Sequence, residues 1–165
     1  MFKIIRTYKE KMPPMRLIGQ PYYDKDRDEL GSFSKKWDEW FINNKFEVLE
    51  KLQPLFDDYI GCMRFNNGQF EYWIGMFFPS NTPAPEGYEY VDIGEGHIGT
   101  NWVYGSQEGN ELFSKEVHDA CVKKLKEFNW MPADTWFFER YNCPRFTHPD
   151  IDGNVILDYC IYLKD

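Results

Sequence analysis

Hydrophobic residues in the first half of the chain follow a strand, helix, strand, strand pattern. Ser34 can cap a helix that Asn43-Asn44 interrupts and Pro54 ends. Its apolar residues recur at helical spacing: Trp37, Trp40, Phe41, Val48, Leu49 and Leu52. The Asn66-Asn67-Gly68 sequence predicts a hairpin turn, because both central residues of such a turn need positive φ. The predicted strands cover residues 15–23, 59–65 and 70–78.

The second half of the chain repeats this order after a proline-rich linker at residues 80–87, which has no periodicity. Asn110 can cap a helix over residues 111–128. The apolar stripe of this helix comprises Phe113, Val117, Ala120, Cys121, Leu125 and Phe128. Strand-like runs lie at residues 88–93, 100–104, 135–141 and 155–163. The halves share little sequence identity, so the repeat is one of pattern.

Two such halves predict one α+β domain over residues 1–165, with pseudo-repeats at about 14–79 and 88–164 joined by a linker at 80–87. Each helix has one apolar face, so we expect antiparallel sheets that carry helices on one side. The opposite sheet faces can then form a concave cleft lined by aromatic side chains. Clefts of this kind are where small-molecule sites tend to lie.

One carboxylate interrupts the aromatic strand at residues 135–141. Side chains alternate along a strand, so Phe137, Glu139 and Tyr141 share one face. Burying a carboxylate between aromatic rings is costly without a cation or hydrogen-bond donors. We interpret Glu139 as the counter-charge of a ligand. The alternative is a buried ion pair with an arginine: Arg16, Arg64 or Arg145.

Composition narrows the choice of partners. Aromatic residues make up 19% of the chain, which suits a cavity for flat or cationic molecules as well as an aromatic core. The net charge of −8 argues against direct contact with nucleic acid and is compatible with attracting cations. No apolar run reaches membrane-spanning length, and no signal peptide is recognisable. The four cysteines are well separated, which predicts a reduced cytoplasmic protein with buried thiols.

Several motifs resemble catalytic or metal sites without the required context. Residues 94–99 match a G-x-G-x-x-G string, but a strand follows where a nucleotide site needs a helix, so we expect a bent or bulged strand. Residues 150–154 lack the ligand order of a calcium loop and predict a hairpin turn. The histidines are dispersed, so no metal site and no cofactor are expected. His118 is expected to be solvated, and Cys143 to be a packed thiol.

The segments at residues 70–76, 85–90, 99–105, 138–141 and 155–159 together resemble the GyrI-like small-molecule-binding domain, also called the AraC-type effector-binding domain. The resemblance covers the chain from about Met15 and implies a duplicated β-α-β-β fold of SHS2-like repeats around a ligand cleft. Multidrug-binding transcription regulators of this family hold cationic lipophilic compounds against a buried glutamate, which matches Glu139. Tyr141 lies beside it. The expected walls of the pocket are Phe137, Trp73, Tyr104 and Trp102.

The resemblance leaves three functions open. With only about 14 residues before Met15, no helix-turn-helix is expected, so the chain would be a stand-alone binding protein for aromatic or cationic lipophilic molecules. Some family members are instead hydrolases that open cyclopropane rings of DNA-alkylating natural products. In that case Glu139 would activate water and Tyr141 would assist. Other members bind DNA gyrase, so gyrase or a DNA-binding regulator is a possible protein partner. Oligomeric state and enzymatic activity stay undecided.

Overall fold

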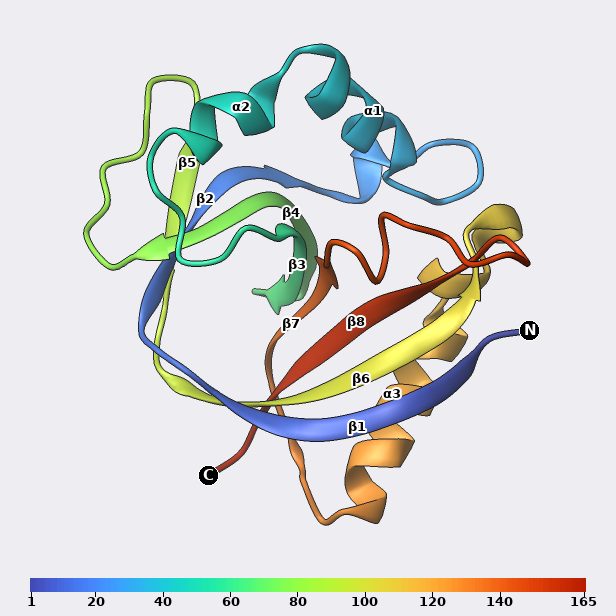
Figure 1. Cartoon of the computed structure of the whole chain (residues 1–165). Coiled ribbons are helices and arrows are strands. Elements are labelled where there is room, and N and C mark those ends of the chain that lie inside the picture. The colour runs from blue at the N-terminus through green and yellow to red at the C-terminus, as the bar shows by residue number, and fades with distance from the viewer. The chain divides into compact units, whose positions relative to one another are not determined.

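A computed structural model describes all 165 residues and divides them into two compact units. Unit 1 contains residues 1–12 and 96–165, and unit 2 contains residues 13–95. Both units are α+β, and all strand pairs within them are antiparallel, which confirms the predicted fold class (Figure 1).

Unit 2 contains a four-stranded sheet. Its helices follow the first of these strands and precede the second along the chain. Its strands are β2 (Met15–Tyr22), β3 (Tyr59–Asn66), β4 (Gln69–Pro79) and β5 (Glu89–Ile93), in the order β3-β4-β2-β5. Its helices are the 3-10 turn η1 (Asp24–Asp26), α1 (Ser34–Ile42) and α2 (Lys45–Glu50). Pro21 lies on β2 beyond the last residue that pairs with β5, where the missing N–H breaks no ladder on that side.

The predicted helix of unit 2 is split as expected at Asn44, whose φ of 54° ends α1 and begins α2. The kink also changes which residues face the core. Trp40 and Leu49 are buried as predicted, and Phe46 joins them. Phe41 and Val48, expected on the buried stripe, are exposed. A single helical period cannot hold across a left-handed residue, so the stripe of α1 does not continue into α2.

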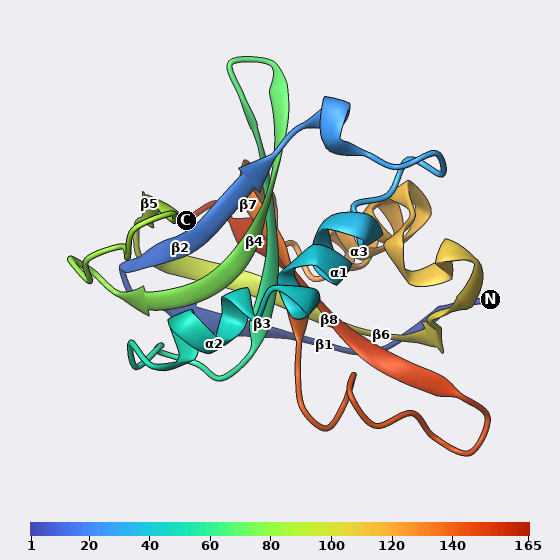
Figure 2. The ribbon, with the colours of Figure 1, turned by 90° about the horizontal axis from the view of Figure 1, so that it is seen from above.

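The predicted hairpin joins β3 and β4 (Figure 2). Its central residues, Asn67 and Gly68, have φ of 53° and 77°, as this type of tight turn requires. The register pairs Asn66 with Gln69 and continues to Ile60 opposite Gly75.

Unit 1 has the same arrangement as unit 2. Its strands are β1 (Lys3–Met12), β6 (Gly96–Ser106), β7 (Pro132–Tyr141) and β8 (Asn154–Leu163), in the order β1-β6-β8-β7. Its helices are the 3-10 segment η2 (Glu108–Phe113) and α3 (Lys115–Glu127). In Figure 1, α3 packs against the sheet of this unit, where Val117, Cys121 and Leu125 meet Leu157 and Ile161 of β8.

The second helix starts later than predicted. Asn110 has a φ of 63° and lies inside η2, so it does not cap a helix. The helix α3 begins at Lys115 with Ser114 as its N-cap. Two consecutive left-handed residues, Gly109 and Asn110, prevent residues 111–114 from continuing as regular α-helix.

Strand β1 was not predicted, because its alternating pattern contains many charged residues. It pairs with β6 and forms an edge of the sheet in unit 1. Strand β5, expected at the start of the second half, pairs with β2 in unit 2. Each unit is therefore a β-α-β-β core extended by a strand that, in sequence, precedes the core of the other unit.

The glycines at residues 94–99 do not form a phosphate-binding loop, because β6 already begins at Gly96. Gly99 lies in close contact with helix α3. A Cβ atom built at this position would lie 2.4 Å from Cδ2 of Leu125 on α3. The predicted turn at residues 150–154 is present, since Oδ1 of Asp150 accepts hydrogen bonds from the backbone N–H groups of Asp152 and Asn154. None of the helices has the length and apolar character needed to cross a membrane.

Candidate functional site

Glu139 is a buried carboxylate near the end of β7, with 6% of its surface exposed. Strand alternation places it on the same face as Phe137 and Tyr141. The Tyr141 hydroxyl donates a hydrogen bond to Oε1 of Glu139 over 2.9 Å. The expected grouping of these three residues on one face is therefore present in the structure.

Helix α3 covers this face of the sheet, so the expectation that Glu139 would lie on the helix-free face, where the cleft was predicted, is wrong. Glu139 is paired in register with Tyr159 on β8, and the Tyr159 hydroxyl lies 2.7 Å from Nδ1 of His118 on α3. The imidazole of His118 packs on the Phe137 ring, with 4.7 Å between centroids. Together Glu139, Tyr141, Tyr159, His118 and Phe137 form a polar cluster with aromatic walls, called the Glu139 cluster below.

His118 and Tyr159 were missed as site residues. His118 was expected to be solvated, but it is half-buried between Phe137 and Tyr159. Its spacing from Cys121 and Leu125 was the available signal, because positions three and seven residues apart lie on one helical face. Tyr159 lies in a strand of mostly apolar residues. The contact of its hydroxyl with His118 forms only because α3 packs over β8.

Burial shapes the protonation of this cluster. Burial lowers the pKa of His118 below its ordinary value, so the neutral imidazole is favoured. Burial, followed by the nearby Glu139 carboxylate, raises the pKa of the Tyr159 hydroxyl well above its usual range. The hydroxyl of Tyr159 and the imidazole of His118 are therefore neutral hydrogen-bonding groups near neutral pH.

Two of the expected pocket walls lie on the other face of the same sheet. Trp102 pairs in register with Asp158, and Tyr104 with Ile156, whereas Glu139 pairs with Tyr159. Neighbouring residues on β8 point to opposite faces. Trp102 and Tyr104 are therefore separated from Glu139 by the sheet itself.

The rings of Trp102 and Tyr104 already have partners within unit 1. The guanidinium groups of Arg6 and Arg145 lie 4.7 and 4.4 Å from the Trp102 ring. The Tyr104 hydroxyl binds the carboxylate of Asp150, and it also accepts a hydrogen bond from the side chain of Asn154. Both rings thus stabilise the local fold.

Trp73, the remaining expected wall, lies on β4 in unit 2. It is buried, and its indole N–H donates to Oε1 of Glu71 over 3.2 Å. Glu71 is a second buried carboxylate that the sequence analysis missed, and it accepts hydrogen bonds from Arg64 and Asn66 as well. The sequence could have indicated Glu71, because this carboxylate lies among aromatic residues in β4 as Glu139 does in β7.

The three arginines considered as partners of Glu139 each bind another carboxylate. Their ion pairs are Arg16 with Asp92, Arg64 with Glu71 and Arg145 with Asp158. Asp158 has no exposed surface, and Nε of Arg140 also donates to it over 2.9 Å. Two of these three carboxylates, Glu71 and Asp158, are buried, whereas Asp92 is exposed.

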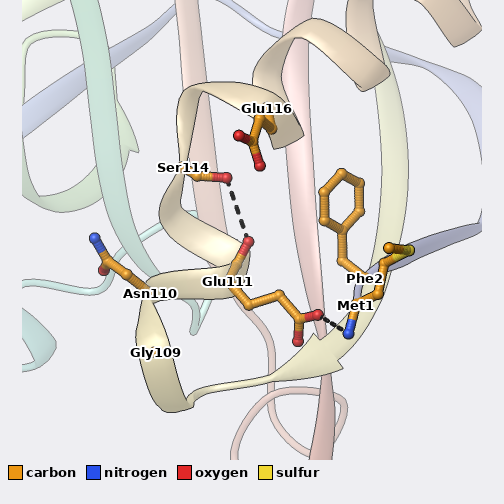
Figure 3. Close-up of a pocket in the computed structure, with 7 residues that line it drawn as sticks. All are labelled: Met1, Phe2, Gly109, Asn110, Glu111, Ser114 and Glu116. Atoms are coloured by element: carbon orange, nitrogen blue, oxygen red, sulfur yellow. Dashed lines mark hydrogen bonds and ion pairs between the residues drawn. The ribbon is translucent and has the colours of Figure 1, made fainter.

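Two surface pockets lie away from Glu139. The larger, of about 530 Å³, is in unit 1 beside the start of α3 (Figure 3). There the terminal ammonium of Met1 pairs with Glu111, and the Ser114 hydroxyl donates to the Glu111 carbonyl oxygen over 3.4 Å. The smaller, of about 130 Å³, lies in unit 2 at the kink between α1 and α2. Neither pocket is lined by Glu139.

The potential metal ligands and the thiols were also located in the structure. No group of three or more His, Cys, Asp and Glu side chains is arranged to hold a metal ion. Three of the four thiols are buried as predicted, but Cys143 is exposed, which corrects the expectation of a packed thiol. Its Sγ lies 4.0 Å from Nδ1 of His148.

Solved structures share this fold at low sequence identity. A Staphylococcus aureus MU50 protein described as a candidate bacterial transcription regulator aligns with a TM-score of 0.68 at 12% identity, over 98% of this chain and 99% of that one. SAV2435 bound to tetraphenylphosphonium aligns with a TM-score of 0.63 at 12% identity, over 97% and 94%. The C-terminal domain of EcmrR aligns with a TM-score of 0.61 at 6% identity, over 97% and 98%.

No protein-family model and no curated protein matches the sequence. At identities of 6 to 12%, the structural likeness establishes a common fold with these proteins. Function has to be argued from the side chains of this chain.

Proposed function

We propose that this chain is a small-molecule-binding domain of the GyrI-like type, which takes an aromatic or lipophilic cation beside Glu139. The observation that carries the proposal is the burial of Glu139 among aromatic rings, with Tyr141 donating to it. The fold supports the same function, because SAV2435 shares it and was solved with tetraphenylphosphonium bound.

The chemistry of the Glu139 cluster suits such a ligand. The hydrogen bond from Tyr141 orients the carboxylate, whose charged form would attract a cation. Phe137 and Tyr141 present aromatic surface on the same face, and each ring contact with a cation contributes roughly 0.5–2 kcal/mol. A delocalised organic cation loses little hydration on entering a site of this kind.

Thermal unfolding in the presence of tetraphenylphosphonium tests the proposal. A cation at 100 times its dissociation constant should stabilise the protein by about 2.7 kcal/mol. Glu139→Gln should weaken binding about tenfold or more, which corresponds to a loss of about 1.4 kcal/mol. Triphenylphosphine oxide, a neutral aromatic compound, should stabilise the wild type much less.

The matched control is Glu127→Gln, which removes the same charge from the exposed end of α3. Binding to this variant should equal wild type, so that a general effect of net charge is separated from a local one. Equal stabilisation of wild type and Glu139→Gln by the cation would refute the counter-charge role.

The same carboxylate supports a second candidate function, hydrolysis. A buried glutamate can act as a general base towards water, and the Tyr141 hydroxyl, 2.9 Å from Oε1, can orient the reacting groups. Incubation with a cyclopropane-bearing alkylating compound, followed by mass spectrometry, separates the two functions. A product heavier by one water that disappears in Glu139→Gln indicates an enzyme, and unchanged compound at stoichiometric protein leaves binding.

A further inference from the structure

The small pocket of unit 2 lies where α1 ends and α2 begins, next to the first residue of β3. The left-handed conformation of Asn44 turns the chain sharply at this point and opens the surface between the two helices. The pocket has a volume of about 130 Å³. Sites for drug-sized ligands measure roughly 300–1,000 Å³, so this pocket suits only a compact group.

Aromatic rings form the walls and floor of this pocket. Phe46 and Tyr59 stack with centroids 3.8 Å apart and planes 5° from parallel. Phe41 stands beside both rings, at 5.4 Å from Phe46 and 6.0 Å from Tyr59, and 53% of its surface is exposed. Trp40 is buried beneath them, at 4.7 Å from Phe46. A half-exposed phenylalanine completing a cluster of buried rings leaves aromatic surface open to a ligand.

Two carboxylates line the same pocket. Glu47 and Glu50 are exposed residues one helical turn apart on α2. The Tyr59 hydroxyl donates to Oε1 of Glu50 over 2.5 Å, which holds that carboxylate beside the rings. No basic side chain pairs with either glutamate, and the lysine at the start of α2, Lys45, donates instead to Gln20. The ammonium of Lys45 also lies 5.6 Å from the centroid of the Trp40 ring, so one cation stands beside the pocket without forming an ion pair with Glu47 or Glu50.

Aromatic faces and carboxylates that form no ion pair attract the same class of ligand. The quadrupole of each ring favours a cation over its face, and recognition of quaternary ammonium groups by several rings is a recurrent use of this interaction. A metal ion would need several converging oxygen ligands, which these two carboxylates do not supply. We propose that the pocket at the α1–α2 kink is a binding site for a compact organic cation of the quaternary ammonium class. This site lies in unit 2 and is independent of Glu139, which lies in unit 1.

Choline is a suitable probe, because 3,3-dimethylbutan-1-ol has the same shape without the charge. Titration followed by NMR of the indole and backbone N–H groups should show saturable shifts at Trp40, Phe41 and Tyr59. The neutral alcohol should bind at least about fivefold more weakly, as expected for loss of about 1 kcal/mol of cation–π attraction. Equal affinity for choline and the neutral alcohol would overturn the proposal, since the pocket would then bind apolar groups without selecting for charge.

Two variants locate the site. The double change Glu47→Gln with Glu50→Gln should weaken choline about fivefold. Phe41→Leu should do the same, and the fold should persist because Phe41 is half exposed. The control is Glu39→Gln, which removes one negative charge from an exposed position of α1 that is paired with Lys36. Unchanged choline affinity in both test variants would refute the site.

Glu139→Gln separates this proposal from the one above. Choline shifts at the α1–α2 pocket should be unaltered in this variant, even if tetraphenylphosphonium binding is lost. If Glu139→Gln abolished the choline shifts, the ammonium site would belong to the Glu139 cluster and the proposal for unit 2 would fail.

Discussion

Single residues show how this chain stabilises buried negative charge. Burial alone would raise the pKa of Glu71, but hydrogen bonds from Asn66, Arg64 and Trp73 lower it below its ordinary value. Asp158 is held by two arginines. Glu139 accepts a hydrogen bond from the Tyr141 hydroxyl.

His118 should make stability depend on pH. Its folded-state pKa lies below the ordinary 6.5 because of burial. The unfolded chain therefore binds more protons than the native state when the pH falls below about 6.5. The stability that the neutral imidazole contributes is present above that pH and is lost as pH falls through the lower folded pKa. Urea unfolding between pH 7 and 5 should show this decrease in the free energy of unfolding.

His118→Gln should flatten this part of the pH profile, because glutamine can still bond to the Tyr159 hydroxyl but does not titrate. His148→Gln, which changes an exposed histidine, is the control and should keep the wild-type slope. The carboxylates with lowered pKa values, such as Glu10 and Glu71, titrate at more acidic pH. A slope that survives in His118→Gln would contradict this account.

The residues of the Glu139 cluster could be predicted only in part. Glu139 stood out because it interrupts an apolar strand, and period-two alternation correctly grouped it with Phe137 and Tyr141. Alternation within one strand does not reveal the register with the neighbouring strand, and it is this register that decides which residues of the two strands share a face. Trp102 and Tyr104 were therefore expected beside Glu139, although the register with β8 puts them on the opposite face. His118 required knowledge of how α3 docks.

At the scale of elements, α3 packs closely onto β6 at one glycine, Gly99. Leu125 of α3 occupies the space that a side chain at residue 99 would need. The G-x-G-x-x-G string was expected to form a bent or bulged strand, and its last glycine lies against Leu125 of α3. Such a contact is invisible in the sequence, because it arises between segments more than 20 residues apart.

Gly99→Ala should destabilise the protein by about 1–3 kcal/mol, because the added methyl overpacks the contact with Leu125. Chemical unfolding measures this loss. Gly94→Ala is the matched control, since a Cβ at residue 94 meets no atom within 4 Å. Comparable destabilisation by both changes would show that backbone freedom, and not packing against α3, is the reason for these glycines.

At the scale of the whole molecule, the two units repeat one topology, and each carries an added edge strand. The repeat extends to a cross-strand ion pair. Arg64 on β3 faces Glu71 on β4 in unit 2, and Arg140 on β7 faces Asp158 on β8 in unit 1. The pairs occupy equivalent second and third core strands. Internal duplication, expected from pattern alone, is thus visible in matching side-chain chemistry.

Deleting residues 1–12 should act on unit 1 selectively. This deletion removes β1 from the edge of β6 and takes away Glu10, which pairs with Arg140. Amide hydrogen exchange should become faster in β6, whose edge loses its partner, while the β3–β4 hairpin of unit 2 keeps its protection. Removing only Asp165 is the control and should change neither. Equal loss of protection in both units would contradict the assignment of β1 to unit 1.

The sequence by itself determined the local elements and the kind of chemistry. Helical and strand periods, the Asn-Gly turn and the break at Asn43-Asn44 are short-range signals, so they predicted most strands, the split helix and the α+β class. The position of Glu139 among aromatic residues is also a short-range signal, and it made this residue a candidate site residue. Only the tertiary structure decided which unit β1 and β5 join, which face Trp102 occupies and what His118 touches. Those outcomes depend on register and docking between distant segments, and local preference carries no information about either.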